Sequence, residues 1–109
     1  MITEKILLMG NWGTGTDAVA HVLKKEGITF QKVLLDEYEI QLKKTVPDIV
    51  LLILSEKEAK DTTLISTIRQ AYEHLPLMVI SDPLQWEGVV NIMKAGATDF
   101  MALPLAKEK

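Results

Sequence analysis

Continuous apolar runs alternate along this chain with segments in which apolar residues recur every three or four positions. A short continuous run is typical of a strand covered on both faces, whereas the wider spacing is typical of a helix with one buried side. The runs predict five strands, at residues 5–9, 28–35, 48–54, 77–81 and 99–102. The spaced segments predict four helices between them, at residues 16–26, 37–45, 55–74 and 82–95.

Capping residues mark the expected helix ends. Thr16 can cap the first helix, and Gly27 can close it. Ser55 and Glu58 have the spacing of a capping box. Asp82-Pro83 predicts the start of the last helix, because Pro is favoured at the first helical position. Apolar spacing then predicts the following inward-facing residues: Val19, Val22 and Leu23; Ile40; Leu64, Ile65 and Ile68; Trp86, Val89, Val90 and Met93.

Regular alternation of strands and helices predicts a parallel sheet with helices on both faces. Five strands suit the flavodoxin-like order 2-1-3-4-5, so the predicted fold is a single α/β three-layer sandwich over residues 1–109. A final helix usually completes such a domain, but residues 105–109 are too few for one. We therefore expect that helix to be short or missing, and the chain to be a shortened piece or the N-terminal domain of a longer regulator.

Composition excludes several classes of function. The 109 residues are 48% hydrophobic and 25% charged, which is ordinary for a globular domain. A net charge of −3 argues against a nucleic-acid surface, and the absence of cysteine excludes disulfides and thiolate metal sites. We see no signal peptide and no apolar stretch long enough to span a membrane, so we expect a cytoplasmic protein.

Three segments together resemble one family. Residues 93–104 read Met-Lys-Ala-Gly-Ala-Thr-Asp-Phe-Met-Ala-Leu-Pro, residues 79–82 read Val-Ile-Ser-Asp, and residues 47–54 read Pro-Asp-Ile-Val-Leu-Leu-Ile-Leu. With the apolar run at 5–9, they resemble the receiver domains of bacterial response regulators over nearly the whole chain. The resemblance implies the receiver fold and a role in two-component signal transduction.

The resemblance also locates a corner where receivers accept a phosphoryl group on an aspartate. Ile53 stands at the acceptor position, and Gly10 and Asn11 stand where the family has the acidic pair that binds magnesium. Leu103 replaces the lysine that pairs with the phosphoryl group, while Ser81 retains the family's hydroxyl. The resemblance therefore implies a degenerate phosphorylation corner.

Such a corner lacks the groups that phosphoryl transfer needs. Isoleucine has no nucleophilic oxygen, and neither Gly10 nor Asn11 supplies the carboxylate that magnesium prefers. We expect Ile53 and Leu103 to pack against each other and to plug the former pocket. The sequence thus predicts a pseudo-receiver that is no enzyme, takes no cofactor or metal, and acts through protein–protein contacts independently of phosphorylation.

The family uses its fourth helix and fifth strand to contact partners or to dimerise. The residues that match this face are Trp86, Ile92, Phe100 and Met101. Large aromatics and methionine are typical interface anchors, although Phe100 also suits plain core packing. We expect a protein partner, an output domain or a homodimer at this face, and no direct contact with nucleic acid or membrane.

A glycine-rich loop at 10–16 supports a competing interpretation, a small-ligand or nucleotide-binding domain. Gly13, Gly15 and Ala18 formally match G-x-G-x-x-A, and Asp36 follows about twenty residues on. However, Gly13 lies four residues past the strand and no lysine follows Gly15 as in a P-loop. The residues that would bind the ligand are Gly10, Trp12, Gly13, Gly15 and Thr16. Trp12 could instead cover the pocket or anchor a partner.

The remaining polar residues suggest no further chemistry. His21 and His74 are far apart and lack carboxylate neighbours at metal-ligand spacing. Acidic residues cluster at expected helix starts, where they complement the helix dipole rather than act as general acids or bases.

Overall fold

The computed structural model describes residues 5–11 and 13–103, with the backbone alone at residue 14. Its five strands are β1 (Ile6–Gly10), β2 (Gln31–Val33), β3 (Ile49–Leu54), β4 (Leu77–Ser81) and β5 (Asp99–Ala102). They pair in parallel in the order β2-β1-β3-β4-β5, which confirms the predicted topology. The helices are α1 (Thr14–Lys25), α2 (Tyr38–Lys44), α3 (Glu56–Ala59), α4 (Thr63–Ala71) and α5 (Trp86–Ala95), with a 3₁₀ helix at Leu35–Glu37.

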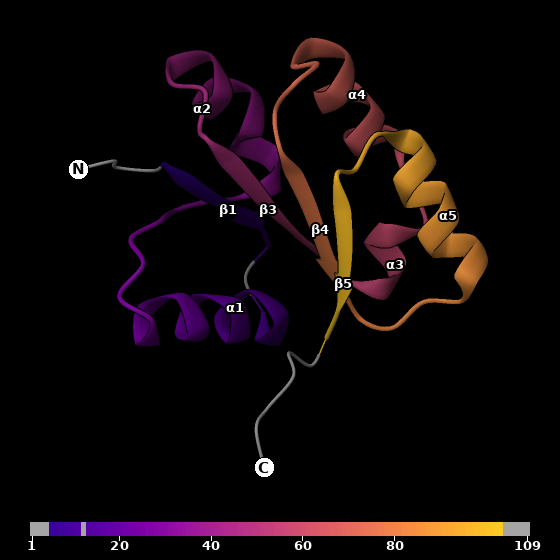
Figure 1. Ribbon diagram of the computed structural model, residues 1–109, viewed down its shortest axis with the longest axis horizontal. Helices are drawn as coiled ribbons and strands as arrows, with labels where there is room; N and C mark the ends of the chain where they lie inside the picture. Colours follow the sequence, from indigo (N-terminus) through magenta and orange to yellow (C-terminus); the bar gives the residue numbers. More distant parts are fainter. Residues whose placement is uncertain (1–4, 12, 104–109) are drawn as a thin grey trace.

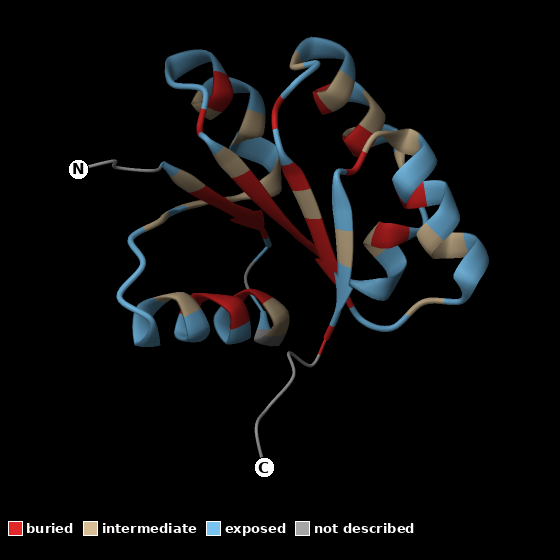
Figure 2. Cartoon of the chain, viewed as in Figure 1, coloured by how far each residue is buried: buried red, intermediate tan, exposed pale blue. Residues whose placement is uncertain are grey.

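Helices cover both faces of the sheet (Figure 1). Among the described elements, α1 covers one face, where Val19 and Ala20 pack against Leu8, Leu51 and Ile80. The other four helices lie over the opposite face and enclose a larger apolar core. The central strands are therefore buried on both sides, as Figure 2 shows by their red colour. This explains why β3 and β4 are continuous apolar runs rather than alternating ones.

Residues 55–74 do not form one helix. Ser55 and Glu58 make the predicted capping box, but it opens the short α3, and α4 starts anew at Thr63. Asp61 lies between the two helices, and its Oδ1 accepts a hydrogen bond of 3.0 Å from the Thr63 backbone N–H. Hydrogen bonds from the Thr63 side chain and backbone lower the pKa of the Asp61 carboxyl. Aspartate and threonine favour such local bonds over helix interiors, which accounts for the break.

The last helix starts later than predicted and buries a different side. Asp82 and Pro83 lie in the loop before α5, since Pro disfavours helical backbone at the residue preceding it. The side chain of Trp86 is 70% exposed, and those of Val90 and Met93 are also exposed, whereas Ile92 is fully buried. The apolar spacing therefore identified the helix but chose the wrong face of it.

Four smaller expectations were also wrong. Thr16 lies inside α1 rather than at its cap, which is Gly13. Val22 is exposed, although it follows the expected spacing. In α2 the side chain of Ile40 is 65% exposed, and Leu42 is the residue that anchors the helix in the core. The second strand, at Gln31–Val33, is also shorter than residues 28–35 because it forms an edge of the sheet with only one neighbour.

Arg69 ties the end of α4 to the end of α5. Its Nε donates a 2.8 Å hydrogen bond to the Gly96 carbonyl, and its Nη1 donates to the carbonyls of Tyr72 and Glu73. A further donation reaches the Thr98 hydroxyl at 3.3 Å. Gly96 has φ +124°, and a Cβ there would stand 2.6 Å from Arg69 Cγ, so this tie requires glycine.

Two predictions concern residues outside the described part of the chain. These are the role of Trp12 and the missing final helix. Within the described residues, every helix is too short or too polar to cross a membrane.

Candidate functional site

The five residues of the predicted corner meet at the carboxyl edge of the sheet. Gly10 ends β1 and pairs with Ile53 of β3. Ser81 ends β4, and its carbonyl accepts a 2.7 Å hydrogen bond from the backbone N–H of Leu103. Asn11 follows β1 directly. Parallel strands place their carboxyl ends at one edge, which is why residues so distant in sequence come together here.

Apolar side chains line the part of the corner where receiver domains have charged residues. Ile53 is 4% exposed and belongs to the same buried cluster as Leu103. A Cβ added to Gly15 would stand 3.0 Å from Leu103 Cδ1 and 3.4 Å from Ile53 Cγ2. At Gly10 a Cβ would stand 2.9 Å from the Ile53 carbonyl oxygen. The two glycines thus let the end of β1 and the first turn of α1 approach Ile53 and Leu103 closely.

A cavity of about 240 Å³ remains beside this contact. Ile53 and Leu103 form its apolar wall and do not fill it. Its lining comes from the first loop with the start of α1, from the end of β3 with α3, and from the residues that follow β4 and β5: Asn11, Gly13, Gly15, Thr16, Ile53, Leu54, Ser55, Glu58, Asp82 and Leu103. The predicted ligand-loop residues Gly13, Gly15 and Thr16 therefore do face a cavity, while Trp12 lies outside the described residues.

Glu58 joins the two sides of the cavity, a role that the sequence did not reveal. Its Oε2 accepts a 2.7 Å hydrogen bond from Asn11 Nδ2, and its Oε1 accepts one of 2.9 Å from the Ser55 backbone N–H. Glu58 N–H in turn donates to Ser55 Oγ at 3.1 Å. The capping-box spacing indicated that Glu58 turns back toward the end of β3, which was the available signal for its place at the corner.

The two buried hydroxyls near the corner are already engaged. Ser81 is fully buried, and its Oγ donates a 2.7 Å hydrogen bond to the Asp82 carbonyl, so it is not among the described residues that line the cavity. Thr16 Oγ1 donates to the Asn11 carbonyl at 2.6 Å and fixes the loop against α1. Neither hydroxyl therefore has a free donor for a group bound in the cavity.

The electrostatics of the cavity oppose the binding of a phosphoryl anion. Among the described residues of its lining, the charged ones are the carboxylates of Glu58 and Asp82. Like charges repel, and none of these described residues carries a positive charge that would offset them. In the described part of the chain, no three histidine or carboxylate side chains are grouped closely enough to hold a metal ion. The acidic lining therefore favours a neutral or cationic group over an anion.

Comparison with known proteins shows which solved structures resemble this one. No family model matches the chain. The receiver domain of NtrX from Brucella abortus superposes with a TM-score of 0.78 at 25% identity, over 93% of this chain and 87% of that one. A putative response regulator from Chloroflexus aurantiacus gives a TM-score of 0.81 at 20% identity, over 96% and 88% of the two chains. This chain has the fold of a response-regulator receiver domain.

The cell cycle transcriptional regulator CtrA of Caulobacter vibrioides is a curated relative, 26% identical over 106 residues. The match covers 96% of this chain but only 46% of CtrA. The chain therefore spans about half the length of the curated relatives that it matches.

The predicted interaction face of this receiver domain is α5 with β5, and its four residues differ in exposure. Trp86 projects into solvent, and Met101 is 43% exposed on the edge strand. Phe100 is half-buried against the larger core, as plain packing requires. Ile92 was wrongly assigned to the surface, because its side chain is the buried contact of α5 with the sheet. Trp86 and Met101 are the two residues that remain available to a partner.

Proposed function

We propose that this receiver domain is a pseudo-receiver, whose state is set without phosphorylation of an aspartate. The observation that carries the proposal is Ile53, an apolar side chain buried at the end of β3 against the residues of the loop after β1. The absence of carboxylates at Gly10 and Asn11 supports it, as does Leu103 in place of a lysine. The domain works in signal transduction in the cytoplasm, and it is a binding module rather than an enzyme.

A phosphoryl-donor experiment tests the proposal. The ¹⁵N-labelled domain is mixed with magnesium and either acetyl phosphate or beryllofluoride, alongside a receiver that carries the acceptor aspartate. We expect the amide spectrum of this domain to stay unchanged while that of the control shifts. Saturable shifts centred on Ile53 and Ser81 would contradict the proposal, because they require a phosphoryl-type group in the corner.

The proposed output is protein–protein contact through α5 and β5. Trp86 supports this, since a large aromatic with most of its surface in water is the kind of residue that anchors interfaces. The partner is an output domain, another protein or a second copy of the chain. Trp86→Ala should weaken self-association or partner binding without loss of stability, whereas Ile40→Ala, which also truncates an exposed apolar side chain, should leave binding unchanged. Sedimentation at several concentrations measures self-association. Equal self-association of the Trp86 and Ile40 variants would contradict the proposed role of Trp86.

The second candidate is a small-ligand domain that uses the 10–16 loop. The cavity of about 240 Å³ at the corner favours it, because Gly13, Gly15 and Thr16 line that space. Its acidic lining restricts the candidate to neutral or cationic ligands rather than nucleotides. Titration with small amines and amides, followed by amide shifts at residues 10–16, separates this function from the first.

A further inference from the structure

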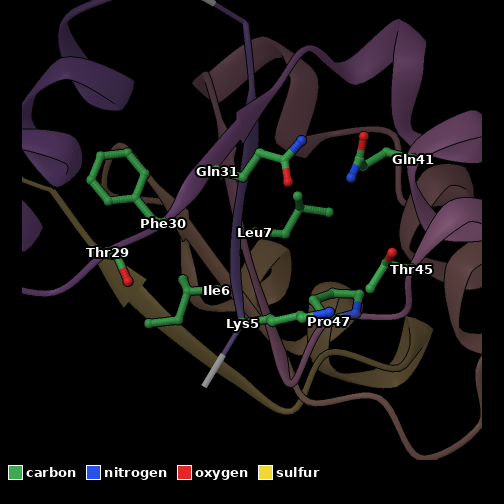
Figure 3. Close-up of a pocket in the computed structure, with 9 residues that line it drawn as sticks. All are labelled: Lys5, Ile6, Leu7, Thr29, Phe30, Gln31, Gln41, Thr45 and Pro47. Carbon is green, nitrogen blue, oxygen red and sulfur yellow. The ribbon is translucent and has the colours of Figure 1, made fainter. Parts of the chain in front are cut away.

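A second cavity lies at the opposite, amino edge of the sheet. It has a volume of about 330 Å³, within the range of small-molecule sites. Its walls come from the start of β1, the segment that enters β2, and the end of α2, as Figure 3 shows: Lys5, Ile6, Leu7, Thr29, Phe30, Gln31, Gln41, Thr45 and Pro47. None of these residues belongs to the corner or to the α5–β5 face, so the cavity is separate from both.

The polar side chains around this cavity have no partner inside the described part of the chain. The carboxamides of Gln31 and Gln41 make no hydrogen bond there, and neither do the hydroxyls of Thr29 and Thr45. Figure 3 shows the two carboxamides pointing toward one another above Leu7. Each carboxamide offers two donors and one acceptor. A planar group that both donates and accepts hydrogen bonds, such as the edge of a nucleobase, fits between two such side chains.

Charge and apolar surface narrow the ligand further. Among the described residues of the lining, Lys5 is the single charged one, so the cavity favours an anionic substituent. Leu7 and Pro47 are buried and supply an apolar floor under the carboxamides. This is the reverse of the corner, whose charged lining residues are both acidic.

We propose that this amino-edge cavity binds a small planar heterocycle with amide-type hydrogen-bonding groups and one anionic substituent, the chemistry of a nucleoside monophosphate. Gln31 and Gln41 hold the edge of the ring, and Lys5 holds the anion. Such a ligand provides an input to the domain that needs neither the acceptor position nor the corner. The site stands on its own residues, so its existence does not depend on whether Ile53 excludes phosphorylation.

Amide-resolved titration of the described domain with AMP, GMP and UMP tests the site. We expect saturable shifts at millimolar concentration for at least one of them, centred on residues 5–7, 29–31 and 41–47. Inorganic phosphate at equal ionic strength should produce no such shifts, because it cannot bridge the carboxamides. Absence of saturation with all three nucleotides would overturn the proposal. So would shifts centred on residues 10–16 and 53–58, which belong to the corner.

Substitutions identify the contacting groups. Gln41→Leu should weaken the binding of the responding nucleotide about fivefold, the loss of one neutral hydrogen bond. Gln31→Leu, at an exposed position that folding does not depend on, should do the same, and Lys5→Met should remove the salt dependence of binding. Gln70→Leu, at an exposed glutamine of α4, is the matched control and should change nothing. Unchanged affinity in both cavity glutamine variants would refute the assignment.

Discussion

Restoring the acceptor residue alone should destabilise the domain rather than activate it. Ile53 is 4% exposed, so I53D both removes a buried side chain and places a carboxylate in apolar surroundings. Truncating a buried isoleucine costs about 2–5 kcal/mol, and the carboxylate adds a desolvation cost. The new charge would also stand at the wall of a cavity that Glu58 and Asp82 already make acidic. We expect a loss of at least about 3 kcal/mol at pH 7, or about 12 °C in Tm at about 4 °C per kcal/mol.

Urea unfolding followed by circular dichroism measures this loss, with two further variants as controls. I53V keeps an apolar side chain and should cost about 0.5–1.5 kcal/mol. I53N has the shape of aspartate without its charge, so the gap between I53N and I53D isolates the charge. Burial raises the pKa of a carboxyl, hence the gap should widen as pH rises above about 4 and close as pH falls. If I53D matches I53N at pH 7, the corner solvates a carboxylate and the reasoning above is wrong.

Two further predictions concern the turns around α4 and α5. Gly96→Ala should cost about 2 kcal/mol or more, because φ +124° is strained for alanine and its Cβ would meet Arg69 at 2.6 Å. Gly27→Ala, with φ +73° and open space around it, is the matched control, and equal losses in urea unfolding would argue against the Arg69 contact. The carboxyl of Asp61 should titrate below its ordinary value of 3.8 in carbon-detected NMR, and Thr63→Val should raise that pKa. Because the pKa of Asp61 is lower in the folded state, this hydrogen bond stabilises the fold at pH values above the unfolded pKa, and that stabilisation is lost as pH falls through the folded pKa. An unchanged pKa in the Thr63→Val variant would show that the hydroxyl contributes nothing.

The sheet could be predicted from sequence because its strands are buried on both faces. β4 was predicted at its observed bounds, since a short apolar run between turns leaves little freedom in placing it. Gly27, a glycine with positive φ, also follows the end of α1 as expected. In both cases a local signal and the tertiary structure demand the same backbone.

Helix faces were harder, because α5 carries two apolar arcs. One arc contains Trp86, Val90 and Met93, and the other contains Val89 and Ile92. Periodicity alone cannot rank the two, and packing against the sheet selects the arc of Ile92. The same limitation applies to α2, where one short helix offered both Ile40 and Leu42.

The corner was predictable in membership but not in shape. Parallel topology brings Gly10, Ile53 and Leu103 to one edge, whatever their side chains are. The cavity that remains there depends on where α3 turns back, and Glu58 reaches Asn11 only because of that turn. No pattern in sequence reports the distance between side chains of separate loops.

The guanidinium of Arg69 makes α5 asymmetric along its length. At the C-terminal end, the Gly96 carbonyl is tied to α4, while at the other end Gln85 caps the helix without a side-chain hydrogen bond. A helix that is fixed at one end moves most at its other end. Any rotation of α5 over the sheet therefore pivots at Gly96 and is largest at Trp86, about 15 Å away at 1.5 Å per residue. The exposed indole of Trp86 therefore lies at the end of α5 farthest from Gly96, next to the loop that leads from the corner.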